Sequence, residues 1–188
     1  MHHDTILAGF GGQGILMIGN LLAVAGLRKG LRATYFPSYG VEMRGGTANC
    51  TVTLASQEIG SPVTQTPLGL IAMNEPSAVK FGPRVRPGGV AVVNASLISA
   101  GAVPREDIRV LRVPCNEAAL ELGDGRLASM VALGAYVGAT RVVGFEHLQE
   151  ALPEVLPEKH HKLIPSNLRA LEVGAEWAAA GGRAGSAA

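Results

Sequence analysis

The stretch Thr5-Ile6-Leu7-Ala8-Gly9-Phe10-Gly11-Gly12-Gln13-Gly14 decides the fold of this chain, and an apolar run over residues 15–27 follows it. A short apolar strand, a glycine-rich turn and a helix, in this order, open many nucleotide-binding α/β folds. Gly9 permits the tight turn, Gly11 lets a ligand approach the backbone, and Gly14 lets helix and strand pack closely. We therefore predict an α/β fold with a Rossmann-like, mostly parallel sheet and flanking helices.

The start of the predicted helix is a candidate anion site, because its backbone N–H groups have no partner within the helix. The amides of Gly11, Gly12 and Gln13 would bind a phosphate, and the Gln13 side chain can donate without carrying a charge. A purely structural turn is the open alternative. NAD is disfavoured, because the predicted second strand, residues 33–37, ends without the acid that binds ribose, and Glu42 is the first acid after it.

Length and composition indicate one domain, which we assign to residues 1–180, with a flexible tail at 181–188. The chain of 188 residues is 47% hydrophobic, 4% aromatic and only 16% charged. So few charges suggest that another chain covers part of the surface. A net charge of +1 without a basic tract argues against a nucleic-acid partner. Because the sequence shows neither an apolar span long enough to cross a membrane nor a signal peptide, we expect no membrane contact and a cytoplasmic location.

The two cysteines, Cys50 and Cys115, stand far apart and in no metal-ligand spacing. We predict that both are buried free thiols, and that this chain alone holds no iron–sulfur cluster, because a cluster normally needs four thiolates. We predict solvated positions, and no metal site, for His2, His3, His160 and His161.

Apolar runs alternate with helical patterns along the rest of the chain, as expected for parallel strands joined by helices. We predict strands over residues 68–73, 90–94 and 108–113. We predict helices beginning at Asn74-Glu75-Pro76-Ser77 and covering residues 116–122, 127–137, 145–152 and 167–180.

One segment breaks this alternation and is predicted to be a β-hairpin excursion. Residues 39–46 form a glycine-rich loop, residues 47–54 alternate as a strand, and residues 58–62 are predicted to pair back onto that strand. Excursions of this kind often carry partner or ligand contacts.

Five blocks of sequence now stand in a fixed order: 9–14 (Gly-Phe-Gly-Gly-Gln-Gly), 39–46 (Tyr-Gly-Val-Glu-Met-Arg-Gly-Gly), 70–74 (Leu-Ile-Ala-Met-Asn), 94–98 (Asn-Ala-Ser-Leu-Ile) and 129–135 (Ser-Met-Val-Ala-Leu-Gly-Ala). These blocks resemble the gamma subunit, or gamma domain, of 2-oxoacid:ferredoxin oxidoreductases. The similarity spans about residues 4 to 178, nearly the whole chain. The short chain and the block ending at Asn74 look most like the 2-oxoglutarate enzyme, although pyruvate, branched-chain and aryl enzymes share this subunit.

The resemblance implies a multisubunit enzyme that decarboxylates a 2-oxoacid on thiamine diphosphate, passes electrons through iron–sulfur clusters to ferredoxin, and transfers the acyl group to coenzyme A. It implies no catalytic residue and no cofactor in this chain. Thiamine diphosphate, Mg²⁺ and the clusters are expected on alpha and beta subunits, with a delta subunit as an open alternative. Gly123-Asp124-Gly125 is no thiamine motif, because the Asn that would complete it is missing until Asn167, and it is predicted to be a turn.

The loop over residues 39–46 is the predicted contact with the catalytic chains. Its Met43 offers an apolar anchor between opposite charges, a combination that suits an interface core with a polar rim. Arg44 could instead bind a substrate carboxylate or a coenzyme A phosphate, and a surface ion pair with Glu42 is a third alternative. The predicted interface residues are Tyr39, Glu42, Met43, Arg44, Gly45 and Gly46; the predicted cofactor contacts are Gly9, Gly11, Gly12, Gln13, Gly14 and Arg44.

Two function classes stay open from the sequence. One is a subunit that shapes an assembled oxidoreductase and contributes to coenzyme A binding, and the other is a free-standing nucleotide- or phosphate-binding protein. A short-chain dehydrogenase is disfavoured, because the chain has no Tyr-x-x-x-Lys.

Overall fold

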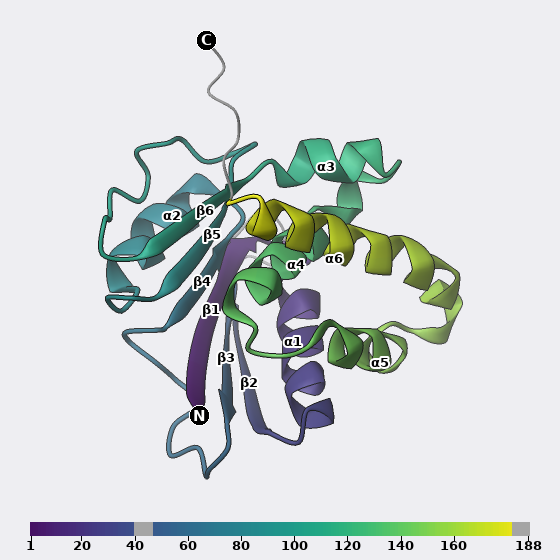
Figure 1. Cartoon of the computed structure of the whole chain (residues 1–188), viewed down its shortest axis with the longest axis horizontal. Helices are drawn as coiled ribbons and strands as arrows, with labels where there is room; N and C mark the ends of the chain where they lie inside the picture. Colours follow the sequence, from purple (N-terminus) through teal and green to yellow (C-terminus); the bar gives the residue numbers. More distant parts are fainter. Residues whose placement is uncertain (40–46, 182–188) are drawn as a thin grey trace.

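The computed structural model describes residues 1–39 and 47–181, with the backbone alone at Tyr39. Within this part the chain forms one mixed sheet in the order β2-β3-β1-β4-β5-β6, flanked by helices on both faces (Figure 1). The strands are β1 (His2–Phe10), β2 (Arg32–Tyr39), β3 (Thr47–Ala55), β4 (Gly69–Ala72), β5 (Val90–Asn94) and β6 (Arg109–Val113). The helices are α1 (Ile15–Arg28), α2 (Glu75–Phe81), α3 (Cys115–Glu121), α4 (Ala128–Thr140), α5 (Phe145–Val155) and α6 (Ile164–Ala179), with 3₁₀ turns η1 (Gly82–Arg84), η2 (Gly125–Leu127) and η3 (Glu158–Leu163).

The sheet confirms the predicted α/β class and its mostly parallel character. Strands β1, β4, β5 and β6 pair in parallel, whereas β3 runs antiparallel to both β1 and β2. The predicted tail at 181–188 lies, apart from Gly181, outside the described residues.

The predicted pairing of residues 58–62 onto the third strand is wrong. Strand β3 has β1 on one side, where Thr51 lies opposite Ile6, and β2 on the other, where Thr51 lies opposite Phe36. Both edges of β3 are therefore occupied, and residues 58–62 form no strand. The hairpin of this fold is β2–β3, placed between β1 and the edge of the sheet.

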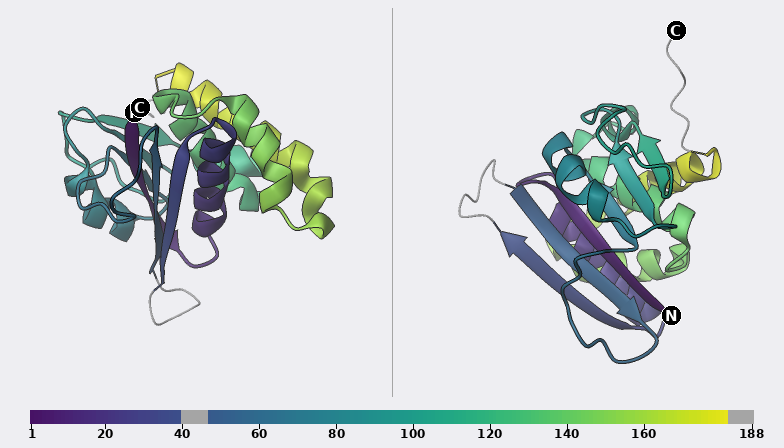
Figure 2. Two further views of the ribbon diagram at one scale, coloured as in Figure 1. Left: turned by 90° about the horizontal axis from the view of Figure 1, so that it is seen from below. Right: turned by 90° about the vertical axis from the view of Figure 1, so that its left-hand side faces the viewer.

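Alternation along the strands divides the core between the two faces of the sheet, because successive side chains point to opposite faces. Leu7 belongs to the large cluster under α1, α4, α5 and α6, whereas its neighbours Ile6 and Ala8 belong to the smaller cluster under α2. Figure 2 shows the sheet standing between α2 on one side and the larger helical layer on the other.

Helix α4 lies at the centre of the larger layer, and its residues 128–137 are all buried. It crosses α6 at a pair of glycines, where a Cβ at Gly134 would lie 2.7 Å from Leu171 Cα, and a Cβ at Gly174 would lie 2.6 Å from Ala135 N. Only glycine fits at both positions, because the facing atoms belong to the backbone.

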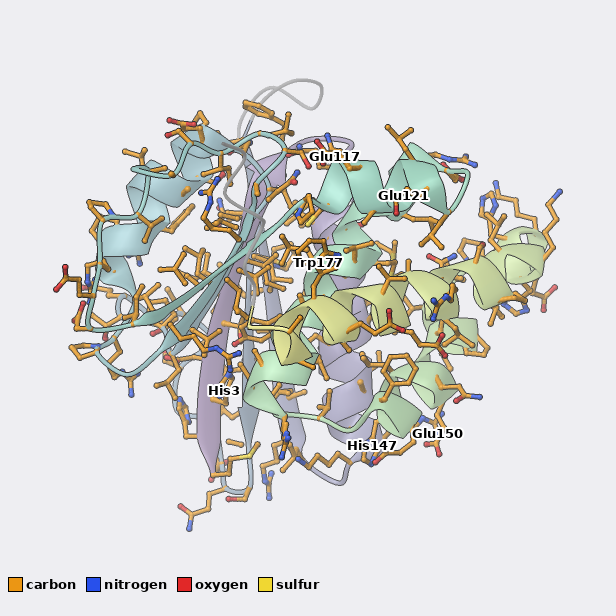
Figure 3. All side chains as sticks on the ribbon, turned by 45° about the horizontal axis from the view of Figure 1, so that its top comes forward. His3, Glu117, Glu121, His147, Glu150 and Trp177 are labelled. Carbon is orange, nitrogen blue, oxygen red and sulfur yellow. The ribbon has the colours of Figure 1, made fainter. Side chains whose placement is uncertain are left out.

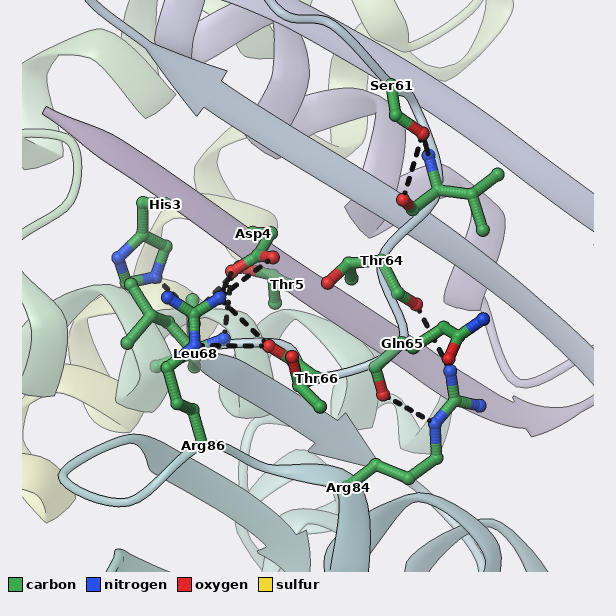
Figure 4. Close-up of polar contacts among 12 residues, drawn as sticks. His3, Asp4, Thr5, Ser61, Thr64, Gln65, Thr66, Leu68, Arg84 and Arg86 are labelled. Carbon is green, nitrogen blue, oxygen red and sulfur yellow. Dashed lines mark hydrogen bonds and ion pairs between the residues drawn. The ribbon is translucent and has the colours of Figure 1, made fainter.

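The long connection from β3 to β4 is held by arginines (Figure 4). Arg84 donates to the carbonyl oxygens of Gln65 (2.9 Å) and Thr64 (3.1 Å), and Arg86 donates to that of Thr66 (2.9 Å). Asp4, buried on β1, accepts from the N–H of Leu68 at 2.9 Å. These contacts tie the connection to β1 and bring β4 alongside it.

His3 is not the solvated residue that the sequence suggested, since β1 begins at His2 and carries His3 into the contact with α4. His3 Nε2 lies 2.6 Å from Tyr136 Oη, and Thr5 Oγ1 lies 2.8 Å from the same oxygen. A buried polar chain on the core side of β1 results.

Candidate anion site at the glycine loop

The glycine loop joins β1 to α1 as predicted, and the local geometry requires glycine at two positions. Gly12 has φ 96° and Gly14 has φ 77°, in the left-handed region that favours glycine. Gly14 is the N-cap of α1, no side chain caps the helix, and its first turn contains no acidic residue. The N–H groups of this turn are therefore available to an anion.

Gln13 first serves the loop itself. Its Oε1 accepts from the Phe10 N–H at 2.7 Å, and its Nε2 donates to the Met73 carbonyl oxygen at 3.2 Å. A Cβ at Gly9 would lie 2.7 Å from that Oε1, so glycine at this position makes room for the Gln13 side chain. The predicted donation from Gln13 to an anion would use the second hydrogen of the same amide nitrogen.

A cavity of about 330 Å³ opens beside this loop, at the carboxyl ends of β1 and β4. Ligands of open α/β sheets bind at this edge, where the strands end and the helices begin. Its lining comes from five places along the chain: Gly12, Gln13, Met73, Asn116, Leu120, Gly125, Arg126 and Ala128.

A second helix also begins at this cavity. Helix α4 follows η2 directly and, unlike α1, continues this 3₁₀ turn: the Ala128 N–H donates to the Gly125 carbonyl oxygen, and the Asp124 side chain caps η2. The open N-terminal partial positive charge at this cavity is therefore that of α1, whereas Asp124 offsets that of the η2–α4 unit. Arg126 adds a full positive charge, although its Nη2 is paired with Asp124 Oδ2 at 2.7 Å, and that hydrogen bond raises the pKa of Arg126 and lowers the pKa of Asp124.

Asn116 and Arg126 were not predicted as site residues. Asparagines end or closely follow β4, β5 and β6, at Asn74, Asn94 and Asn116, and this repetition was the available signal. Asn74 caps α2 by accepting from the Ser77 N–H at 2.9 Å, whereas Asn94 Nδ2 donates to Asn116 Oδ1 at 3.0 Å. Only Asn116 of the three lines the cavity.

The predicted turn at Gly123-Asp124-Gly125 is confirmed, and it supplies one wall of the cavity. Asp124 Oδ1 accepts from the Arg126 N–H at 3.0 Å and so caps η2.

Both cysteines are buried and free, as predicted. Burial raises the pKa of the Cys50 thiol to about 12 and also raises the pKa of Cys115. Within residues 1–39 and 47–181, His, Cys, Asp and Glu side chains form no group of three or more that could hold a metal ion. No helix in the described part is long and apolar enough to cross a bilayer.

The predicted interface residues Glu42, Met43, Arg44, Gly45 and Gly46, and the Tyr39 side chain, lie outside the described residues. The backbone on either side is placed: Tyr39 pairs with Ala48, and Thr47 pairs with Phe10 at the end of β1. The segment therefore leaves and rejoins the sheet at the edge where the glycine loop begins.

The sequence model of one family, pyruvate ferredoxin/flavodoxin oxidoreductase, matches residues 4–177. The chain belongs to this family. The fold confirms the resemblance to gamma subunits. The gamma subunit of a keto/oxoacid ferredoxin oxidoreductase from Geobacter sulfurreducens superposes with a TM-score of 0.80 at 28% identity, and the match covers 95% of this chain and 99% of that one.

Two kinds of curated relative differ in length. Ketoisovalerate oxidoreductase subunit VorA of Methanothermobacter marburgensis is 38% identical over 92% of this chain, but this chain spans only 36% of that relative. The 2-oxoglutarate synthase subunit KorC of the same organism is 31% identical over 94% of this chain and 96% of its own length. The chain thus spans about a third of VorA and nearly all of KorC.

These values correct the expectation that the chain is most similar to the 2-oxoglutarate subunit, and they leave the substrate undecided. Identity to the ketoisovalerate subunit exceeds identity to the 2-oxoglutarate subunit, 38% against 31%. The fold relation extends to a 2-oxoglutarate:ferredoxin oxidoreductase from Magnetococcus marinus, with a TM-score of 0.84 at 25% identity, covering 95% of this chain and 31% of that one.

Proposed function

We propose that this chain is the gamma subunit of a multisubunit 2-oxoacid:ferredoxin oxidoreductase, which converts a 2-oxoacid, coenzyme A and oxidised ferredoxin into acyl-coenzyme A, CO₂ and reduced ferredoxin. The observation that carries the proposal is the match over 95% of this chain and 99% of a solved gamma subunit. Alpha and beta subunits, and in some assemblies a delta subunit, would hold thiamine diphosphate, Mg²⁺ and the iron–sulfur clusters. A cytoplasmic location stays a prediction.

A tagged copy of the chain, purified from native extract under mild conditions, tests the assembly. The proposal requires attached chains that carry bound thiamine diphosphate and iron in stoichiometric amounts. A free-standing nucleotide- or phosphate-binding protein is the alternative, and it would elute as a monomer and bind the nucleotide alone.

Within such an assembly, we assign to the glycine-loop cavity the binding of a phosphate group of coenzyme A. The uncapped start of α1 and the charge of Arg126 favour an anion in the cavity. Gly11 and Gly12 would donate from the backbone, whereas the predicted Gln13 N–H already donates to the Phe10 carbonyl oxygen at 3.1 Å. Gly9 and Gly14 shape the loop that presents the two remaining donors.

Gly12→Asp tests this assignment, because a carboxylate at the loop would repel a phosphate. Gly30→Asp is a matched control, because Gly30 has a positive φ of 82° and, like Gly12, has no atom within 4 Å of an added Cβ. Gly30 follows the other end of α1, away from the cavity. We expect a higher KM for coenzyme A in the assembled Gly12→Asp enzyme, with the Gly30→Asp enzyme unchanged. An unchanged KM in both would remove coenzyme A phosphate from this cavity.

The 2-oxoacid used by the assembly is open between two candidates. The identity of 38% to VorA favours ketoisovalerate, and the identity of 31% to KorC keeps 2-oxoglutarate as the other candidate. Steady-state ferredoxin reduction with each acid decides between them through the ratio of the two kcat/KM values.

The segment over residues 39–46 keeps its proposed role as the contact with the catalytic chains. Its described neighbours lie at the glycine-loop edge, so a partner bound there would also cover the cavity. Arg44→Ala separates the roles: loss of assembly supports an interface role, weaker substrate or coenzyme A kinetics in an intact assembly supports a ligand role, and unchanged behaviour leaves a surface ion pair with Glu42.

A further inference from the structure

A second cavity, of about 400 Å³, lies at the far ends of the two helices that begin at the glycine loop. Helices α1 and α4 are 14 and 13 residues long, so roughly 20 Å separates their ends from the first cavity. Figure 3 shows the two regions on opposite sides of the molecule, with Glu117 and Glu121 on α3 beside the first and His147 on α5 at the second. The volume lies in the range of small-molecule sites.

Arg141 gives this cavity an available cation. It is the one non-glycine residue of the described chain in the left-handed region, with φ 52°, and it caps the end of α4. Glycine is the usual residue at such a position, so the backbone itself gives no reason for arginine. Within the described part, the guanidinium forms no hydrogen bond or ion pair, which leaves its planar set of N–H donors free.

The other charged groups of the lining are already placed. Lys29 Nζ donates to the Val142 carbonyl oxygen at 2.8 Å, which holds a second positive charge at the rim. Glu146 is the one carboxylate of the lining, and its Oε1 lies 3.4 Å from His147 Nδ1, which itself accepts a hydrogen bond from the Gly144 N–H at 3.1 Å. Lys29 and Arg141 therefore supply two cations to the lining, against the one carboxylate of Glu146.

The remaining lining is apolar. Val137 and Val143 are 5% and 2% exposed, Phe145 is half-buried, and Ala175 comes from α6. A ligand that satisfies this cavity therefore needs an apolar body as well as an anionic group.

We propose that this cavity binds a small carboxylate with an apolar body, as a site separate from the glycine loop. The planar fork of Arg141 matches the two oxygens of a carboxylate. The body would lie on Val143 and Phe145. A monoanion fits better than a dianion such as phosphate, because Glu146 repels the second charge. The proposal rests on this cavity alone and does not depend on the proposed function.

Titration of the full-length, isotopically labelled chain with phenylacetate, followed by NMR, tests the site. The neutral analogue 2-phenylethanol has the same ring without the charge, and inorganic phosphate has the charge without the ring. We expect saturable shifts at α4, α5 and α6 residues around the cavity with phenylacetate, and at least about tenfold weaker binding of the other two probes.

Arg141→Gln should weaken phenylacetate binding about tenfold, whereas Arg126→Gln, which removes a cation from the first cavity, should leave it unchanged. Arg141→Gly relieves the left-handed backbone, so it keeps the fold while removing the charge, and it should lose binding equally. The proposal is overturned by an absence of saturable binding, by equal binding of 2-phenylethanol, by tighter binding of phosphate, or by an Arg141→Gln or Arg141→Gly variant that binds as the parent does. A loss of binding in Arg126→Gln would also overturn it.

Discussion

Substituting Gly134 by alanine should destabilise the protein strongly, because the crossing of α4 and α6 has no room for a methyl group. The added Cβ would lie 2.7 Å from Leu171 Cα, whereas ordinary contacts begin near 3.4 Å. The Leu171 carbonyl oxygen would lie closer still, so the two helices would have to separate by more than roughly 0.7 Å, and overpacking of this kind costs about 1–3 kcal/mol or more. Alanine recovers up to about 1 kcal/mol through its higher helix propensity. Because the facing atoms are backbone and cannot rotate away, we expect a net loss of about 2–3 kcal/mol, at the upper end of this range.

Thermal unfolding followed by circular dichroism measures the effect, which corresponds to a Tm lower by roughly 4–12 °C for a domain of this size. Gly138→Ala is the matched control on the same helix, because its Cβ would lie 3.0 Å from Ala175 Cα at an exposed position. We expect the control to stay within about 1 kcal/mol of the parent. A Gly134→Ala protein as stable as the control would refute the tight crossing of these helices.

Three further predictions concern buried polar groups. Tyr136→Phe removes a hydroxyl that contacts both His3 and Thr5, so urea unfolding should show a loss of about 2–3 kcal/mol; a loss below about 0.5 kcal/mol would contradict the buried chain. Burial lowers the pKa of His3 from 6.5, so below pH 6.5 the unfolded chain binds a proton that the folded chain does not, and the free energy of unfolding should fall as the pH falls. His3→Gln should make the free energy of unfolding less dependent on pH in this range. An equal pH dependence in the parent and the variant would contradict the burial of His3. A thiol reagent at neutral pH should label neither Cys50 nor Cys115 before unfolding, since burial raises the pKa of both, and rapid labelling of the native protein would show an accessible thiol.

The sequence predicted the elements that local chemistry determines. The glycine loop followed by an apolar run specified the turn from β1 into α1, and Asn74 with Pro76 specified the start of α2, where the Asn74 side chain accepts from the Ser77 N–H. In each case the residues that specify the structure are close neighbours along the chain.

Features that depend on distant pairing were not predictable in this way. Nothing local to β3 shows that it pairs with β1 as well as β2, and the alternating pattern of residues 47–54 is equally compatible with the wrong partner at 58–62. Asn116 and Arg126 reach the glycine loop from more than a hundred residues away, because the parallel strands end at one edge. His3 was wrongly predicted to be solvated, because it lies near the terminus and its partner, Tyr136, is distant in the sequence.

The central claim, that this chain is the gamma subunit of a 2-oxoacid:ferredoxin oxidoreductase, is tested most directly by activity after removal and return of the chain. The assembly purified through a tag on a partner subunit is stripped of this chain, and 2-oxoacid-dependent, coenzyme A-dependent reduction of ferredoxin is measured before removal, after removal and after the purified chain is added back. The account predicts that activity falls on removal and returns when the chain is restored. Full activity in the stripped assembly, or no partner subunit that binds this chain, would contradict it.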